Sequence, residues 1–227
     1  HALSSKKLED YCHKFELKTL ANRILINRKR SGVDDSQLKE EVKEEKNSTK
    51  NEKETLVKTV ALFEAFLKKI RGAEAFSFDT ETTGLDKIQD TPIGISFSFS
   101  DHSSFYIPLL DESLDDLTKE VVVAELKKIF ISPTQGKIAH NLKFDKQMLE
   151  NIGVDVKTPY DDTMLMSFIL DPTRSHSLDN LSLNHLGIKK IKLKELLAQH
   201  KTKSMLDIDL TLLTQYACED SLCCLKL

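Results

Sequence analysis

Phe76-Ser77-Phe78-Asp79-Thr80-Glu81-Thr82-Thr83-Gly84-Leu85-Asp86 is an apolar, β-prone run that ends in two closely spaced carboxylates. Side chains alternate between the faces of a strand, so residues i and i+2 project to the same side. Asp79 and Glu81 are therefore expected side by side at the end of a buried strand. Adjacent buried carboxylates repel each other, and a divalent cation such as Mg²⁺ or Mn²⁺ relieves that cost. An isolated Asp-x-Glu also fits a purely structural role, with Asp79 as an N-cap, residues 82–84 as a turn and Glu81 in solvent.

A second acidic position lies in Ala139-His140-Asn141-Leu142-Lys143-Phe144-Asp145, where a short strand is predicted to lead into a helix. Asn141 is the expected N-cap, which places Asp145 near the first turn. An acid there is favourable to the helix dipole by about 0.3–1 kcal/mol, so this position also has a structural explanation.

The third position is near the end of the chain, in a helix predicted to begin after Asp209. Tyr216 and Asp220 are spaced i and i+4 and therefore share a helix face. Glu219 is predicted to point elsewhere, into solvent.

The pattern between these positions predicts an α/β fold, with a mixed β-sheet flanked by α-helices. Strands are expected at 76–79, 91–99, 104–109 and 137–140, with the first three as an antiparallel meander. Helices are expected at 56–70, 114–130 and 142–152.

Composition predicts a cytoplasmic protein. The 227 residues carry a formal net charge of −3, which excludes a general basic nucleic-acid footprint. No apolar run approaches the roughly 18 residues of a membrane span, and no signal segment is visible. The four cysteines show no metal-ligand spacing, and three of them are expected as reduced, buried thiols on one helix.

Three regions differ in character. Residues 1–30 have helix-like apolar spacing and are predicted to be a small helical segment, whereas residues 31–54 are charged and are predicted to be a linker. Residues 55–227 are predicted to form the main domain.

The three acidic positions together resemble the DEDD 3′–5′ exonucleases. Asp79-Thr80-Glu81, Asn141-x-x-x-Asp145 and Tyr216-x-x-x-Asp220 match the motifs of this family in order, in the version that carries tyrosine. The context resembles the proofreading domain of bacterial family A DNA polymerases (DNA polymerase I). The segments that carry this closer resemblance are Gly94-Ile95-Ser96, Tyr106-Ile107-Pro108-Leu109, Asp162-Thr163-Met164-Leu165-Met166-Ser167 and Leu170-Asp171-Pro172. The resemblance implies a ribonuclease H-like fold, and residues 1–30 resemble the end of a 5′-nuclease domain.

The resemblance also implies a site with two divalent ions, Mg²⁺ or Mn²⁺. Asp79 is expected to bridge both ions, Glu81 and Asp220 to complete one of them, and Asp145 to serve the other. Tyr216 is expected to orient the attacking water, because a phenol with a pKa near 10 is a poor base at neutral pH.

The implied substrate is a single-stranded DNA 3′ end. The resemblance assigns contacts with it to Thr82, Leu85, Asn141 and Phe144, although Leu85 and Phe144 also fit core packing and Asn141 also fits a cap. The lysines of the 189–203 run are either phosphate contacts or a solvated face.

The resemblance implies a monomeric fragment of a polymerase, whose polymerase domain would be the partner within the same parent chain. Two alternatives stay open. One is a catalytically silent spacer with an exonuclease fold, and the other is a stand-alone RNA-trimming DEDD enzyme.

Overall fold

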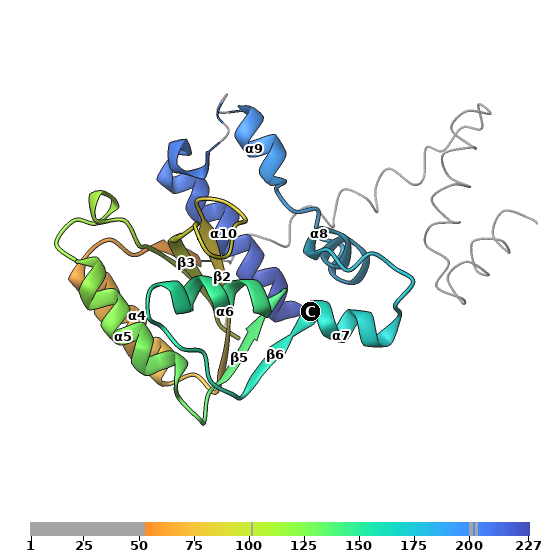
Figure 1. The fold of residues 1–227 in the computed structure, drawn as a ribbon, viewed down its shortest axis with the longest axis horizontal. Helices are drawn as coiled ribbons and strands as arrows, with labels where there is room; N and C mark the ends of the chain where they lie inside the picture. Colours follow the sequence, from red (N-terminus) through yellow and green to blue (C-terminus); the bar gives the residue numbers. More distant parts are fainter. Residues whose placement is uncertain (1–52, 101, 200–201, 203) are drawn as a thin grey trace, which may run out of the picture. The chain divides into compact units, whose positions relative to one another are not determined.

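The computed structural model describes residues 53–100, 102–199, 202 and 204–227 (Figure 1). The segment predicted at residues 1–30 and nearly all of the linker predicted at 31–54 lie outside the described residues. The last two residues of that linker, Lys53 and Glu54, belong to the first strand, so regular structure begins before the expected start at residue 55.

One mixed sheet organises the described part of the chain, in the strand order β1-β4-β3-β2-β5-β6. Its strands are β1 (Lys53–Leu56), β2 (Ala75–Thr82), β3 (Pro92–Ser98), β4 (Ser103–Pro108), β5 (Gly136–Ala139) and β6 (Tyr160–Asp162). The predicted meander is confirmed, because β2, β3 and β4 pair antiparallel in sequence order. The outer pairs β1–β4, β2–β5 and β5–β6 are parallel.

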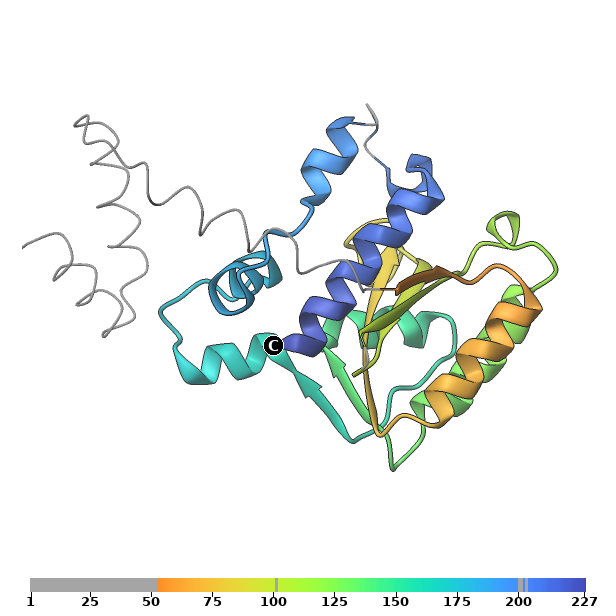
Figure 2. The same ribbon diagram turned by 180° about the vertical axis from the view of Figure 1, so that it is seen from behind.

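Helices cover both faces of this sheet, which confirms the predicted α/β class (Figures 1 and 2). They are α4 (Val60–Arg71), α5 (Lys119–Phe130), α6 (Leu142–Asn151), α7 (Thr163–Leu170), α8 (Leu178–Leu181), α9 (Leu193–Gln199) and α10 (Leu210–Lys226). Helix α10 begins after its N-cap Asp209, as predicted. Three cysteines on it, at positions 218, 223 and 224, are buried free thiols, also as predicted.

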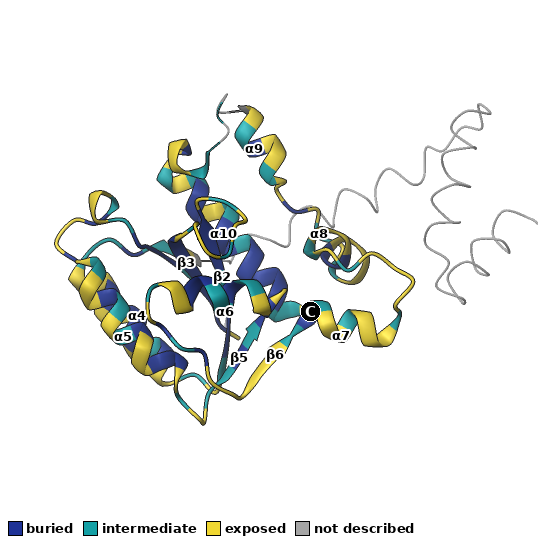
Figure 3. Cartoon of the chain, viewed as in Figure 1, coloured by how far each residue is buried: buried dark blue, intermediate teal, exposed yellow. Residues whose placement is uncertain are grey.

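Two apolar cores lie on the two faces of the sheet. One joins α4 and α5, which lie side by side in both views, to the inward phenylalanines of the strands. The other joins the far face of the sheet to α9 and α10 through Ile93, Tyr106, Leu213 and Ala217. Figure 3 shows buried residues along α10 and exposed ones on the outer sides of α4, α5 and α7. The central strands are therefore covered on both faces, which fixes their register.

Alternation along β2 places its acids on one face. Phe76 and Phe78 contribute to the core with α4 and α5. Ser77 points the other way, and its hydroxyl donates to the Ser221 carbonyl on α10 over 2.6 Å. Asp79 and Glu81 continue the Ser77 side and therefore face α10.

Two predicted helices begin later than expected. Leu56 lies in β1, paired with Tyr106, and α4 starts at Val60 after the N-cap Thr59. Helix α5 starts at Lys119 rather than at Leu114. Leu114 and Leu117 have helix-like spacing and are buried, but they lie in a segment that is not helical. The spacing of apolar residues indicates which side chains are buried. In these two places the buried residues belong to a strand or a loop and not to a helix.

Candidate active site

Asp79 and Glu81 form the strand side of an acidic cluster. Burial raises the pKa of Asp79 well above its usual value, and the charges of Asp145, Glu81 and Asp220 raise it further. The pKa of Glu81 is raised by burial and then by Asp220. Asp79 and Glu81 therefore lie near each other, as their i, i+2 spacing predicts, and both helical acids also raise their pKa values.

Asp145 enters the cluster from α6 and is held by the strand between the two acids. Its Oδ1 accepts the backbone N–H of Thr80 over 3.0 Å and the Thr80 hydroxyl over 2.7 Å. Burial raises the pKa of Asp145 to about 7, against the lowering effect of these bonds. Asp145 therefore does more than stabilise the first turn of α6, because its two hydrogen bonds with Thr80 also connect it to β2.

Asn141 is the N-cap residue of α6, as predicted, but its side chain does not cap the helix. Asn141 precedes α6 with a left-handed backbone (φ 66°), and its side chain makes no cap hydrogen bond. Asp162 caps this end instead, and its carboxylate accepts the N–H groups of Asn141 and Leu142 over 3.1 and 2.9 Å. Asparagine tolerates the left-handed region better than most residues, which explains its presence without a capping bond. Its exposed side chain is free to contact a ligand.

Helix α10 contributes Tyr216 and Asp220 from one face. Burial raises the pKa of Asp220 to about 6, although Lys190 opposes this. Burial and then the charges of Asp220 and Glu81 raise the pKa of the Tyr216 phenol. A phenol that holds its proton so firmly can orient a water but cannot accept a proton at neutral pH, as expected from the sequence.

Lys190 is the site residue that the sequence interpretation missed. Its ammonium forms an ion pair with Asp220, lies 3.5 Å from Asp179 Oδ1, and lies 5.7 Å from the centre of the Tyr216 ring. Its side chain is only 2% exposed, whereas Lys189, Lys192 and Lys194 are exposed as a solvated face would be. The sequence offered no signal that singles it out, because Lys190 lies in the run Lys189-Lys190-Ile191-Lys192-Leu193-Lys194.

Glu219 is not the solvated residue that was predicted. Its Oε2 accepts the backbone N–H of Ile191 over 2.7 Å. It therefore ties the segment that carries Lys190 to the helix that carries Asp220.

The four residues that the resemblance assigns to substrate differ in exposure. Leu85 is 85% exposed, so its alternative role in core packing is wrong. Phe144 is half-buried. Thr82 is buried, and its hydroxyl donates to the Gly84 carbonyl over 2.7 Å, which shapes the turn before Leu85. Their contacts with a substrate stay predictions.

The chemistry of the donors fits divalent ions. Among the described residues, the buried atoms Glu81 Oε1 and Asp220 Oδ1 have no hydrogen-bond partner, although the latter touches the Lys190 ammonium. Carboxylate oxygens are the ligands that Mg²⁺ and Mn²⁺ prefer. No three of the described acids, histidines or cysteines are arranged as a ready group of metal ligands.

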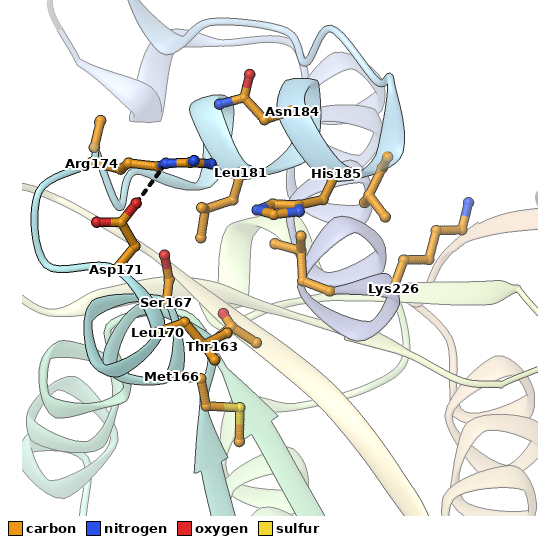
Figure 4. A pocket seen from close by; sticks show the side chains of 13 residues that line it. Thr163, Met166, Ser167, Leu170, Asp171, Arg174, Leu181, Asn184, His185 and Lys226 are labelled. Atoms are coloured by element: carbon orange, nitrogen blue, oxygen red, sulfur yellow. Dashed lines mark ion pairs between the residues drawn. The ribbon is translucent and has the colours of Figure 1, made fainter. Parts of the chain in front are cut away.

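A cavity of about 530 Å³ lies away from this cluster, between α7 and the turn after α8 (Figure 4). His185 and Leu181 point into it, and Arg174 pairs with Asp171 at its rim over 2.6 Å. None of the four acids lines it.

The raised pKa values predict that stability falls as pH rises when divalent ions are chelated. Asp145 and Asp220 have pKa values of about 7 and about 6 in the folded protein, whereas an aspartate exposed to water has a value of 3.8. Between these limits the folded state binds more protons than the unfolded state, so the free energy of unfolding decreases with pH. We expect a loss of at least about 1.4 kcal/mol from pH 5 to pH 8, the value of one pKa unit.

Urea unfolding in EDTA at each pH measures this loss. Asp145→Asn is the matched variant, because the amide keeps an acceptor for Thr80 and carries no charge. Its stability should depend less on pH than that of the parent. A parent that is more stable at pH 8 than at pH 5 in EDTA would contradict the raised pKa values.

The sheet order, the flanking helices and the acids at the end of the central strand define the class of protein, a ribonuclease H-like α/β nuclease fold. The solved structure of Escherichia coli RNase D is similar, with a TM-score of 0.58 and 16% identity over 75% of this chain and 42% of that one. Residues 55–227 match the 3′–5′ exonuclease family of DNA polymerase A. The chain belongs to this family.

Two curated relatives agree with the family. DNA polymerase I of Pseudomonas aeruginosa is 32% identical over 169 residues, which are 70% of this chain and 18% of that protein. DNA polymerase I of Borreliella burgdorferi is 31% identical over 173 residues, which are 76% of this chain and 19% of that protein. The chain thus spans about a fifth of the length of these relatives. Among the described residues, no helix has the length and apolarity needed to traverse a bilayer.

Proposed function

We propose that this domain removes nucleotides from the 3′ end of single-stranded DNA, as the proofreading part of a DNA polymerase I. The observation that supports the proposal is that Asp79 on β2 is buried and that the charges of Glu81, of Asp145 on α6 and of Asp220 on α10 all raise its pKa. Four carboxylates with the Lys190 ammonium beside Asp220 leave an excess of negative charge that divalent ions would balance. The proposal includes a monomeric protein in the cytoplasm and a polymerase domain in the same parent chain.

The proposed site would hold two ions: Asp79 would serve as a ligand of both, Glu81 and Asp220 would serve one of them, and Asp145 would serve the other. Bound divalent ions of this kind supply an activated water and neutralise charge on the phosphate and the leaving 3′-oxygen. Thr80 keeps Asp145 in place through its two hydrogen bonds. Tyr216 would orient the attacking water through its hydroxyl, and the aliphatic side chain of Leu85 would contact the terminal base.

The test is the degradation of a 5′-labelled single-stranded DNA oligonucleotide by the whole 227-residue chain. Reactions contain Mg²⁺, Mn²⁺ or EDTA. A ladder that shortens from the 3′ end and depends on the metal supports the proposal. A folded protein that cleaves with neither metal would overturn it in favour of a catalytically silent spacer.

Cleavage of an RNA oligonucleotide of the same sequence distinguishes the proposed DNA exonuclease from the second alternative, an RNA-trimming enzyme. The solved structures with this fold include an RNase D described as an exoribonuclease involved in structured RNA processing. The proposal expects faster cleavage of DNA. Faster cleavage of RNA would assign the domain to RNA trimming.

Tyr216→Phe should lower the cleavage rate by about 10- to 100-fold without abolishing it, the range of a group that orients a reactant. The variant loses only the hydroxyl, so α10 should keep its packing. Single-turnover rates with saturating Mg²⁺ measure the effect. A rate equal to that of the parent would remove Tyr216 from the site.

A further inference from the structure

Lys190 is buried beside the acidic cluster, whereas the described lysines near it in the chain, Lys189, Lys192 and Lys194, are exposed. Its side chain is 2% exposed, and its ammonium lies between Asp220 on α10 and Asp179 on α8. Asp220 belongs to the four acids of the proposed site. Asp179 does not, and its side chain is 48% exposed. The ammonium therefore has one partner inside the proposed metal site and one at its edge.

The backbone on both sides of Lys190 is fixed. Gly187 ends the preceding turn in the left-handed region (φ 72°), and the Ile188 N–H donates to the Ser182 carbonyl over 3.1 Å. On the other side, the Ile191 N–H donates to Glu219 Oε2 over 2.7 Å. Because Glu219 is adjacent to Asp220, this bond sets the distance between the lysine segment and the acid. The position of Lys190 is thus built into the fold rather than left to a free surface side chain.

The charge of Lys190 reaches three of the four acids. It lowers the pKa of Asp79, Glu81 and Asp220 against the effect of their burial. The proposed function assigns these same three acids to one of its two ions. Two cations that use the same carboxylate repel each other, so the ammonium and that ion exclude each other from Asp220.

We propose that Lys190 is an internal counter-cation that competes with the divalent ion held by Asp220 and moves to Asp179 when that ion binds. This inference rests on the proposed metal site but concerns ion affinity, not cleavage. A lysine side chain has four rotatable bonds in its stem, so an ammonium that already lies 3.5 Å from Asp179 needs only a small rotation. The shift keeps the buried ammonium paired in both arrangements, which avoids the cost of an isolated buried charge.

The experiment measures Mn²⁺ binding by the whole chain without DNA, using calorimetry and the electron paramagnetic resonance of free Mn²⁺. Lys190→Met should lower the Kd of the tighter ion by at least about 10-fold, or about 1.4 kcal/mol. Lys189→Met is the matched control, since it removes the same charge from an exposed neighbour. It should change the Kd by less than about 2-fold, the size expected for a screened surface charge.

Asp179→Asn tests the second position of the ammonium. Alone, it should raise the Kd for Mn²⁺, because the displaced ammonium loses its other partner. In the Lys190→Met background it should have no effect, and this loss of additivity separates the switch from a general change in local charge.

Thermal unfolding keeps the test independent of activity. In EDTA, Lys190→Met should unfold at a lower temperature than the parent, because the acids lose their counter-cation. Saturating Mn²⁺ should raise its midpoint by more than that of the parent. A Lys190→Met variant that folds only with Mn²⁺ would also support the inference, because the ion would then replace the missing ammonium.

The outcomes separate the inference from the proposed function. Equal or weaker Mn²⁺ binding by folded Lys190→Met overturns the inference and leaves the exonuclease proposal intact. Tighter binding by a protein that cleaves no DNA supports the inference and counts against the activity. If neither parent nor variant binds Mn²⁺, the inference and the metal site are both wrong.

Discussion

Asp79→Ala should reduce removal of the 3′-terminal nucleotide by at least about 10³-fold, which corresponds to about 4 kcal/mol of transition-state stabilisation. Asp79 is the acid whose pKa is raised by each of the other three, so it lies electrostatically at the centre of the cluster. It is the residue proposed to contact both ions. Its removal should therefore weaken the binding of both proposed ions.

The same substitution should leave the fold intact. Asp79 ends up in a cluster where burial and like charges disfavour its ionised form, so a neutral side chain removes repulsion rather than a stabilising contact. In EDTA at pH 8 the free energy of unfolding should be equal to that of the parent or higher. Loss of cleavage together with kept stability would identify a catalytic role.

Cleavage of labelled single-stranded DNA with Mg²⁺ and urea unfolding in EDTA measure the two effects. Glu64→Ala is the control, since it removes an exposed carboxylate from α4 on the other face of the sheet. Its cleavage rate should match that of the parent. Near-full activity of Asp79→Ala would show that the metal assignment is wrong.

Phe97→Ala should lower the free energy of unfolding by about 3–5 kcal/mol, the usual cost of removing a core phenylalanine. Phe97 on β3 is fully buried, and its ring centre lies 4.8 Å from Phe66, 5.6 Å from Phe76 and 6.1 Å from Phe130. It thus joins α4, the site strand and α5 at one point. The cavity left by alanine would be lined by rings that cannot collapse into it without moving these elements.

Urea denaturation at pH 6 measures this change. Phe168→Ala makes the same chemical change on α7, where the side chain is 52% exposed, and should cost less than about 1 kcal/mol. Equal losses in the two variants would mean that the phenylalanine cluster does not determine stability.

The elements that the sequence predicted well are those whose pattern is local. Alternating residues in the segments that form β3 (Pro92–Ser98) and β4 (Ser103–Pro108) predicted the meander, because alternation of apolar and polar side chains is typical of strands. The start of α10 followed from Asp209, whose carboxylate accepts the N–H groups of Thr211 and Leu212. The i, i+2 spacing of Asp79 and Glu81 likewise placed both acids on one face.

Local patterns failed where the partner of a residue is far along the chain. Leu56 continues the helical spacing of the next residues, but its backbone pairs with Tyr106, which is 50 positions away. Asn141 has the right residue type for a cap, yet the carboxylate that caps α6 comes from Asp162. A single sequence does not say which distant strand or loop will supply a hydrogen bond.

By itself, the sequence determined the α/β class and the family resemblance. It also predicted four acids and Tyr216 as site residues, because spacing along a strand or helix fixes which side chains share a face. Only the tertiary structure decided that Lys190 enters the site while Lys189 stays in solvent. Both lysines lie in the same charged run, and their difference comes from Glu219, which binds the Ile191 backbone from α10. The electrostatics of the site depend on that long-range contact, which no local pattern encodes.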